Sequence, residues 1–241
     1  MSSVTFNRYF SLIALFLSLS AHASFRHVAS IAAGADIVTV HMNQNITLIS
    51  PFQNTYVSNN HIEDFVGGLF IGVENPIYGN VLGQIGVSYY QNNGYEAQGL
   101  VYQFADPSMG NLYYQYNITS QRILAESKVL LSYQEKYHPF INLGVGEAIN
   151  TASQYREVPV TSASVPMFPG FNDRTTHSFA YLIGIGVDMD VSANMRLGAM
   201  YRYVNLGQAQ LSTTSIQESN DTLKNNPFYA SEILLQLSYL G

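Results

Sequence analysis

The chain has 241 residues, of which 11% are charged, and a formal net charge of −6; it holds 18 tyrosines but neither cysteine nor tryptophan. Ordinary soluble domains contain about 25% charged residues, so this composition argues against one. The absence of cysteine excludes disulfides and thiol chemistry, and the acidic balance argues against nucleic acid as a partner. A membrane β-barrel suits low charge with many Tyr and Gly. A secreted β-sandwich shares these features and stays the alternative.

Residues 1–23 have the three parts of an export signal. Arg8 provides the positive start, an apolar core runs from Leu12 to Leu19, and Ala21-His22-Ala23 gives a small-x-small cleavage site. The apolar core is too short to span a membrane. We expect a signal peptide over 1–23 and a barrel domain over 24–241.

Apolar and polar residues alternate with period two along most of the remaining chain. This period predicts strands, since successive side chains point to opposite faces of the pleat. The predicted strands are 24–40, 65–74, 81–89 with 96–104 as its continuation, 111–133, 140–148, 179–191, 195–203 and 228–241. The last run is long enough to cross a bilayer, which takes about 9–11 residues. We expect it to close on the first strand and form a ring.

The predicted connections alternate in length along the chain. The long ones are the polar stretches 41–63, 150–177 and 207–227, with a shorter reversal at 105–110; the short ones are 75–80, 134–139 and 192–194. Long loops outside and short periplasmic turns are typical of outer-membrane barrels. The fold class we predict is therefore all-β: an eight-stranded antiparallel transmembrane β-barrel with long outer loops and short periplasmic turns.

Ionised residues of both signs fall on the inward faces of these strands, where they are expected to form an ion-pair network. They are Asp36, Glu74, Arg122, Glu126, Lys128, Asp188, Asp190, Arg196, Arg202 and Glu232. A register slip of one residue would turn Arg196 and Arg202 into lipid. Side chains just fill an eight-stranded barrel, which favours a polar plug over a narrow charged pore. We expect Asp188 and Asp190 to pair with the arginines of the adjacent strand.

No arrangement of residues points to catalysis or to a metal. Histidines are scattered, and metal sites need them at ligand spacing. His177, Ser178 and Asp173 are the one local cluster, but neighbours on a strand point to opposite faces. We predict no enzyme activity, no cofactor and no metal site.

Short motifs resemble the small eight-stranded outer-membrane barrels, the OmpA-like and OmpW-like domains found in Gram-negative intracellular pathogens. They are His138-Pro139-Phe140-Ile141-Asn142-Leu143-Gly144-Val145-Gly146, the Gly-Ile-Gly of 184–186, Arg202-Tyr203 and the alternating last strand. The resemblance implies an outer-membrane location, with lipid and lipopolysaccharide around the barrel. It also implies assembly by periplasmic chaperones and the barrel-assembly machinery.

The resemblance also assigns an assembly signal to the last strand, at Tyr229, Ile233, Leu235, Leu237 and Tyr239. Family members usually end on an aromatic residue, whereas Leu240 and Gly241 follow Tyr239 here. Recognition by the assembly machinery is the property that this departure affects.

Three functions fit these expectations. The first is a non-enzymatic outer-membrane protein that supports envelope integrity and meets a host or surface ligand through its outer loops. The alternative is an OmpW-like conduit for small hydrophobic molecules, whose mark would be an apolar hole among Leu124, Leu130, Leu182, Leu234 and Phe70. The third is an enzyme at the barrel rim.

Overall fold

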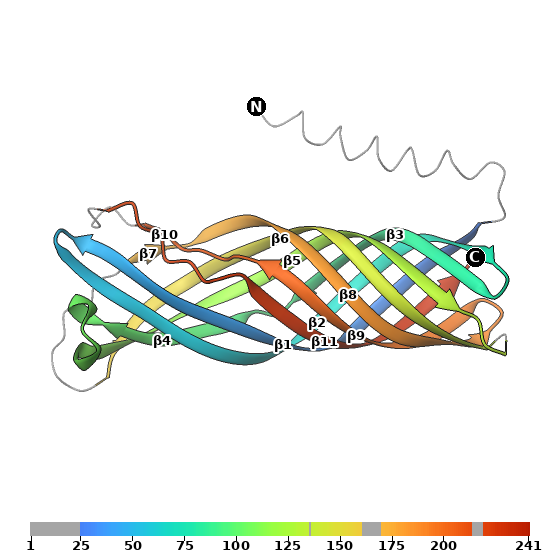
Figure 1. Cartoon of the computed structure of the whole chain (residues 1–241), viewed down its shortest axis with the longest axis horizontal. Helices are drawn as coiled ribbons and strands as arrows, with labels where there is room; N and C mark the ends of the chain where they lie inside the picture. The colour runs from blue at the N-terminus through green and yellow to red at the C-terminus, as the bar shows by residue number, and fades with distance from the viewer. Residues whose placement is uncertain (1–24, 135, 161–169, 214–218) are drawn as a thin grey trace, which may run out of the picture.

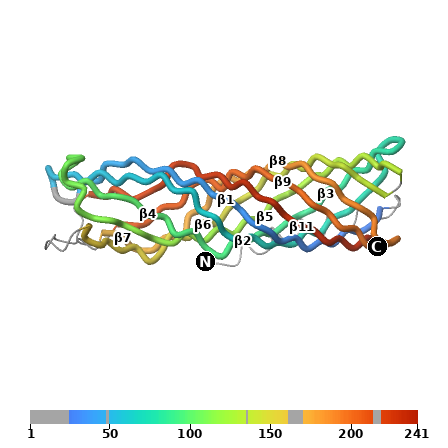
Figure 2. Tube along the Cα trace, turned by 90° about the horizontal axis from the view of Figure 1, so that it is seen from below, coloured from blue at the N-terminus to red at the C-terminus, as the bar shows by residue number. Residues whose placement is uncertain are grey.

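The computed structural model describes residues 25–134, 136–160, 170–213 and 219–241. The predicted signal peptide, 1–23, lies outside the described residues. The described residues form one long cylinder of strands (Figures 1 and 2). In the described part of the chain, no helix is long and apolar enough to cross a membrane.

The strands are long and tilted, and most end in tight connections. They are β1 (Arg26–Ile49), β2 (Phe52–Tyr78), β3 (Val81–Asn92), β4 (Tyr95–Tyr102), β5 (Gly110–Leu131), β6 (Tyr137–Pro159), β7 (Phe171–Asn172), β8 (Arg174–Ser192), β9 (Met195–Gly207), β10 (Ser212–Thr213) and β11 (Phe228–Leu240). Two 3-10 turns, η2 (Gln103–Ala105) and η3 (Pro107–Met109), join β4 to β5.

The main sheet closes into a ring. Its order is β1-β11-β9-β8-β6-β5-β3-β2, and β2 pairs with β1 again. β4 continues β3 beyond a break at Asn93 and Gly94, and it likewise lies between β2 and β5. The wall therefore has eight antiparallel positions, as predicted. The predicted closure is also confirmed, since Ala35 faces Ile233 in the β1–β11 ladder.

The outward faces carry an apolar belt around the half of the barrel nearer the short turns. Every wall strand contributes exposed aliphatic or aromatic side chains there, among them Ile31, Leu69, Ile85, Ile123, Leu143, Ile183, Leu197 and Leu235. In water such a belt would be a very large apolar patch, whereas a membrane covers it. The chain is a membrane-spanning β-barrel.

Two of the predicted long loops are wrong over most of their length. Residues 41–63 belong to β1 and β2, which meet at a tight turn around Ser50 and Pro51. Most of 150–177 likewise extends β6 and β8, and 161–169 lies outside the described residues. The polar residues that suggested loops form the outward face of strands. These parts of the strands lie above the lipid, so their outward side chains face water. Met42, Ile46 and Tyr56 form part of the buried face of 41–63.

The third predicted loop, 207–227, turns back into the barrel over its described residues. Ala209, Leu211 and Leu223 are buried there, with β1 alongside: Asn226 N–H donates to His41 O at 3.1 Å. The described part of this segment packs against the apolar interior, where the sequence suggested only a polar exposed loop.

The two ends of the cylinder differ. Both described chain ends lie at the short-turn end, where His27 N–H donates to Gly241 O at 2.9 Å. The connection 192–194 is there and tight, as predicted. The opposite end carries η2, η3 and the β1–β2 tip (Figure 1). With short turns on the periplasmic side, this long extension faces outward.

Candidate functional site

A four-membered ion-pair cluster crosses the centre of the lumen. Glu232 on β11 contacts Arg122 from β5, on the opposite side of the ring, and Arg202 from the adjacent strand β9. Arg202 Nε lies 3.0 Å from Glu232 Oε2, and Arg202 Nη1 lies 3.8 Å from Glu126 Oε1. The Arg202 guanidinium also lies 3.9 Å from the centre of the Tyr90 ring. The four charged side chains and Tyr90 are buried, so water contributes little to balancing the charges and the four groups compensate one another.

A second cluster lies nearer the short turns. Arg196 on β9 bridges Glu74 on β2 and Asp190 on β8, with nitrogen–oxygen distances of 2.7 Å to each. His138 lies 3.0 Å from the other oxygen of Asp190, and Gln84 donates to Glu74 at 2.7 Å. Strands from several sides of the ring are thereby joined through one guanidinium.

Lys128 forms a further buried ion pair beside these clusters. Its ammonium lies 3.2 Å from Asp188, 3.4 Å from the amide oxygen of Gln236 and 4.0 Å from the centre of the Phe140 ring. Asp188 therefore pairs with Lys128 from β5, whereas an arginine of the adjacent strand was expected. Asp190 does pair with Arg196 of that strand.

Asp36 is the one predicted network residue that joins no ion pair among the described residues. Its Oδ2 accepts a hydrogen bond from the buried Tyr95 hydroxyl at 2.6 Å. The alternation of residues in the sequence placed Asp36 on the inward face. Its partner Tyr95 reaches it because the chain breaks between β3 and β4, and the sequence around that break did not predict this contact.

Glycines on the inner wall make space for the long charged side chains. A Cβ at Gly184 would lie 2.8 Å from Cγ of Arg202, and one at Gly198 would collide with the Asp188 carboxylate. The arginine and the carboxylate therefore lie directly over bare backbone on neighbouring strands.

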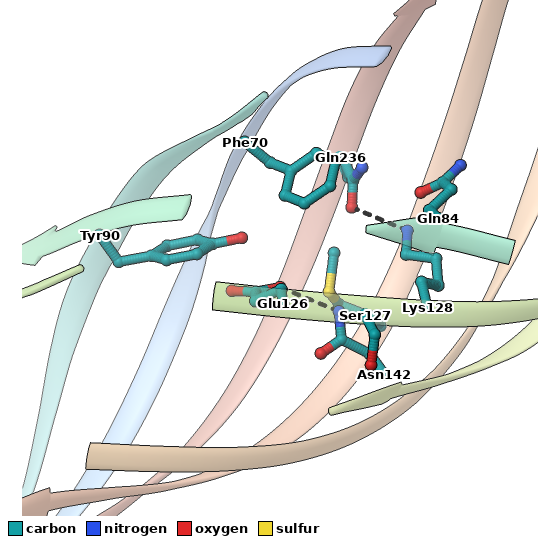
Figure 3. A pocket seen from close by; sticks show the side chains of 9 residues that line it. Phe70, Gln84, Tyr90, Glu126, Ser127, Lys128, Asn142 and Gln236 are labelled. Carbon is teal, nitrogen blue, oxygen red and sulfur yellow. Dashed lines mark hydrogen bonds between the residues drawn. The ribbon is translucent and has the colours of Figure 1, made fainter. Parts of the chain in front are cut away.

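The space left in the lumen is small. Among the described residues, the cavity beside Glu126 and Lys128 measures about 10 Å³, enough for about one water molecule. Figure 3 shows its lining, where Asn142 donates to Glu126 at 3.0 Å and Lys128 reaches Gln236. The residues lining it are Phe70, Gln84, Tyr90, Glu126, Ser127, Lys128, Asn142, Met200 and Gln236.

The outer half of the interior is apolar, which the predicted polar plug did not include. A large buried cluster of strand residues fills it, including Val38, Tyr95, Leu124, Leu182 and Phe228. The alternation of Val38, Val40 and Met42 was the available signal, but it runs from the end of the predicted strand 24–40 into the stretch 41–63 that reads as a polar loop. Among the described residues, charge pairs thus occupy one level of the lumen and apolar side chains another.

The mouth of the barrel holds a carboxyl among aromatic rings. Glu157 accepts hydrogen bonds from Tyr155 at 2.5 Å and from Tyr56 at 3.3 Å. Burial raises the pKa of the Glu157 carboxyl above its usual range, although both hydrogen bonds oppose the shift. Phe171 packs edge-on against both tyrosines, with ring centres 5.0 and 5.7 Å away. Sequence reasoning missed this cluster because it placed 150–177 in a loop.

The five apolar residues that would mark a conduit do not surround a hole. Leu124 and Leu182 are packed in the outer apolar cluster, Leu130 and Leu234 in a second cluster, and Phe70 in a third. Each is buried.

The residues considered for catalysis are held apart. His177 pairs with the exposed Glu147 at 2.9 Å on the outer surface. The Ser178 hydroxyl instead donates to Gln208 O, and Asp173 accepts from Gln154 N–H. No group of three or more potential metal ligands occurs among the described residues.

The predicted assembly signal lies on the outward face of β11. Ile233, Leu235, Leu237 and Tyr239 are exposed in the belt, while Tyr229 is half-buried and stacks on Tyr203 with ring centres 5.4 Å apart.

No protein-family model matches the sequence, and no curated protein matches it. Among solved structures, the outer-membrane protease OmpT of Escherichia coli is similar with a TM-score of 0.50 at 10% identity, over 92% of this chain and 99% of that one. Neisserial surface protein A has a TM-score of 0.45 at 16% identity, over 89% and 96%. OprG of Pseudomonas aeruginosa has 0.46 at 14%, over 91% and 98%. The chain has the fold of the small outer-membrane β-barrels.

Proposed function

We propose that this chain is a closed, non-enzymatic barrel of the outer membrane that supports envelope integrity and presents a rigid extension to surface or host ligands. The observation that carries the proposal is the filled lumen, with Arg122, Arg202 and Glu232 joined across its centre. Ion pairs across the centre, with a buried apolar cluster in the outer half, leave little room for solutes to pass.

The outer extension supports a role at the surface. Strands continue beyond the belt, so binding residues there stand on a sheet, which is more rigid than a loop. Aromatic and aliphatic side chains point outward above the lipid, among them Phe52, Phe104, Tyr113 and Val158. Exposed apolar groups away from the lipid are typical of interaction sites.

Partners follow from this placement. The belt would contact membrane lipid, and the surface just above it would contact lipopolysaccharide. Periplasmic chaperones and the barrel-assembly machinery would deliver the chain, with the outward residues of β11 as the assembly signal. The likeness to OmpT shows the fold alone, and the separation of His177, Ser178 and Asp173 supports a non-enzymatic role.

A deletion strain tests the proposal. We expect the strain to leak more to large antibiotics and to adhere less to surfaces, and a plasmid copy of the chain to restore both. Unchanged leakage together with unchanged adhesion would contradict it. An altered lipid or peptide profile in the strain would instead support an enzyme at the rim.

A further inference from the structure

The wall of the barrel has a gap on one side of the outer extension. Between Val57 and Phe65, these fully described strands show no ladder pairing of β2 with β3 or β4. Backbone bonding resumes on both sides, and at the lower side Asn93 N–H donates to Phe65 O at 3.3 Å. β4 keeps its full ladder with β5 across the same interval. The gap therefore belongs to one seam of the sheet.

Side chains hold the gap open. Asp64 accepts a hydrogen bond from Gly94 N–H at 2.9 Å, and Asn60 accepts one from Gln98 N–H at 3.2 Å. The Asp64 carboxylate and the Asn60 amide thus accept hydrogen bonds that backbone carbonyls would accept in a regular ladder. Because a side chain lies between the two backbones, the strands are farther apart here than in a direct ladder. The break at Asn93 and Gly94 lies at the lower end of this seam.

The gap forms the floor of a cleft of about 460 Å³ on the outside of the barrel, a volume within the range of small-ligand sites. Along β2, eight residues separate Val57 from Phe65 in the lipid belt, which is roughly 20 Å along the barrel axis. The cleft therefore lies above the membrane. Its lining is Val57, Ser58, Asn59, Asn60, Gln98, Gly99, Leu100 and Tyr113.

The lining of this cleft carries no charged side chain and is amphipathic, with more apolar than polar surface exposed. Asn59 and Gln98 supply amides that are each both a donor and an acceptor, whereas the Asn60 oxygen already accepts from Gln98 N–H. Sugar hydroxyls likewise donate and accept. An exposed aromatic side chain lies beside the amides, because the ladder aligns Val57, Leu100 and Tyr113 in one outward row. A half-exposed tyrosine is amphipathic and suits a partner with both C–H and hydroxyl groups.

We propose that this cleft binds a neutral saccharide, with the amides bonding hydroxyls and Tyr113 covering a sugar face. The ligand comes from the core of neighbouring lipopolysaccharide or from a host glycan. The inference deepens the surface role proposed above and rests on the extension facing outward. It does not depend on the lumen being closed.

The chain has no tryptophan, so one introduced at the cleft is a clean reporter. Tyr113→Trp would be refolded in micelles and titrated with the neutral outer-core hexose oligosaccharide of lipopolysaccharide in one arm and N-acetyllactosamine oligomers in the other. A sulfated glycan and an extended peptide would be titrated for comparison. We expect a saturable emission change in at least one arm, and the arm that responds identifies the source. Tyr133→Trp, exposed at the short-turn end, is the matched control and should not respond.

Adding Asn59→Ala or Gln98→Ala to the reporter should weaken binding roughly three- to tenfold, the effect of one lost hydrogen bond. No response in either arm up to about 10 mM, an equal response from the control, or a response only to a sulfated glycan or an extended peptide would overturn the proposal. If the cleft binds no saccharide but the barrel does not conduct, only this inference fails and the proposed function is retained. If the cleft binds a saccharide but the barrel conducts, only the closed lumen is contradicted.

Discussion

Glu232 and Arg122 meet in the middle of the barrel from strands on opposite sides of the ring, 110 residues apart in sequence. The same carboxylate contacts Arg202 through its second oxygen. One buried anion therefore holds two buried cations, which makes it the residue whose loss leaves the most charge without compensation.

Glu232→Ala should destabilise the barrel by about 3–5 kcal/mol, the usual cost of leaving buried partners of an ion pair unpaired. Urea unfolding in lipid vesicles, followed by circular dichroism, measures the change. Glu147→Ala is the control, because its pair with His177 is exposed and such pairs contribute about 0–1 kcal/mol. Equal effects of the two substitutions would mean that the central cluster does not stabilise the barrel.

The seam between the first and last strands should be sensitive to one glycine. A Cβ at Gly34 on β1 would overlap the carbonyl oxygen of Ile233 on β11, while a Cβ at Gly67 would meet nothing closer than 3.7 Å. Gly34→Ala should therefore cost about 1–3 kcal/mol and lower the refolded fraction on gels, and Gly67→Ala should change little. If Gly34→Ala leaves the free energy of unfolding and the refolded fraction unchanged, β1 and β11 are farther apart at this position than the register indicates.

The mouth cluster predicts a pH dependence. Burial raises the pKa of Glu157 in the folded barrel above the 4.5 of an unperturbed carboxyl. Its neutral form is therefore favoured by folding, and this stability is fully present below pH 4.5 and lost as pH rises through the folded-state pKa. Glu157→Gln should be at least as stable as wild type above that window and equal to it in acid. Stability curves of the two proteins measured against pH would check this, and a wild type that gains relative stability as pH rises would contradict the sign.

How much the sequence foretells differs between the two halves of the barrel. In the belt, lipid outside and charge inside impose the same alternation on every strand, so strand number, closure and inward residues such as Arg202 followed from parity alone. Above the lipid, water accepts polar outward residues, and the stretch around Asn43 and Asn45 reads as a loop although β1 runs through it. The partner of Asp36 depended on a break in a distant strand, which no local pattern encodes.

The gap in the wall makes a prediction of its own. Asp64→Ala removes the acceptor for Gly94 N–H, so hydrogen exchange of that amide should accelerate by a factor of about ten, whereas Asp64→Asn keeps an acceptor oxygen and should change it less. Exchange followed by mass spectrometry on peptides covering 93–99 measures both variants. Identical rates in the two variants would show that Asp64 does not hold this strand.

Single-channel recording of the purified wild-type barrel in a planar bilayer examines the closed lumen most directly. With the interior filled from the Glu74–Arg196 pair to the apolar outer half, no steady current should appear. A stable, ion-selective conductance from pure protein would contradict the closed lumen.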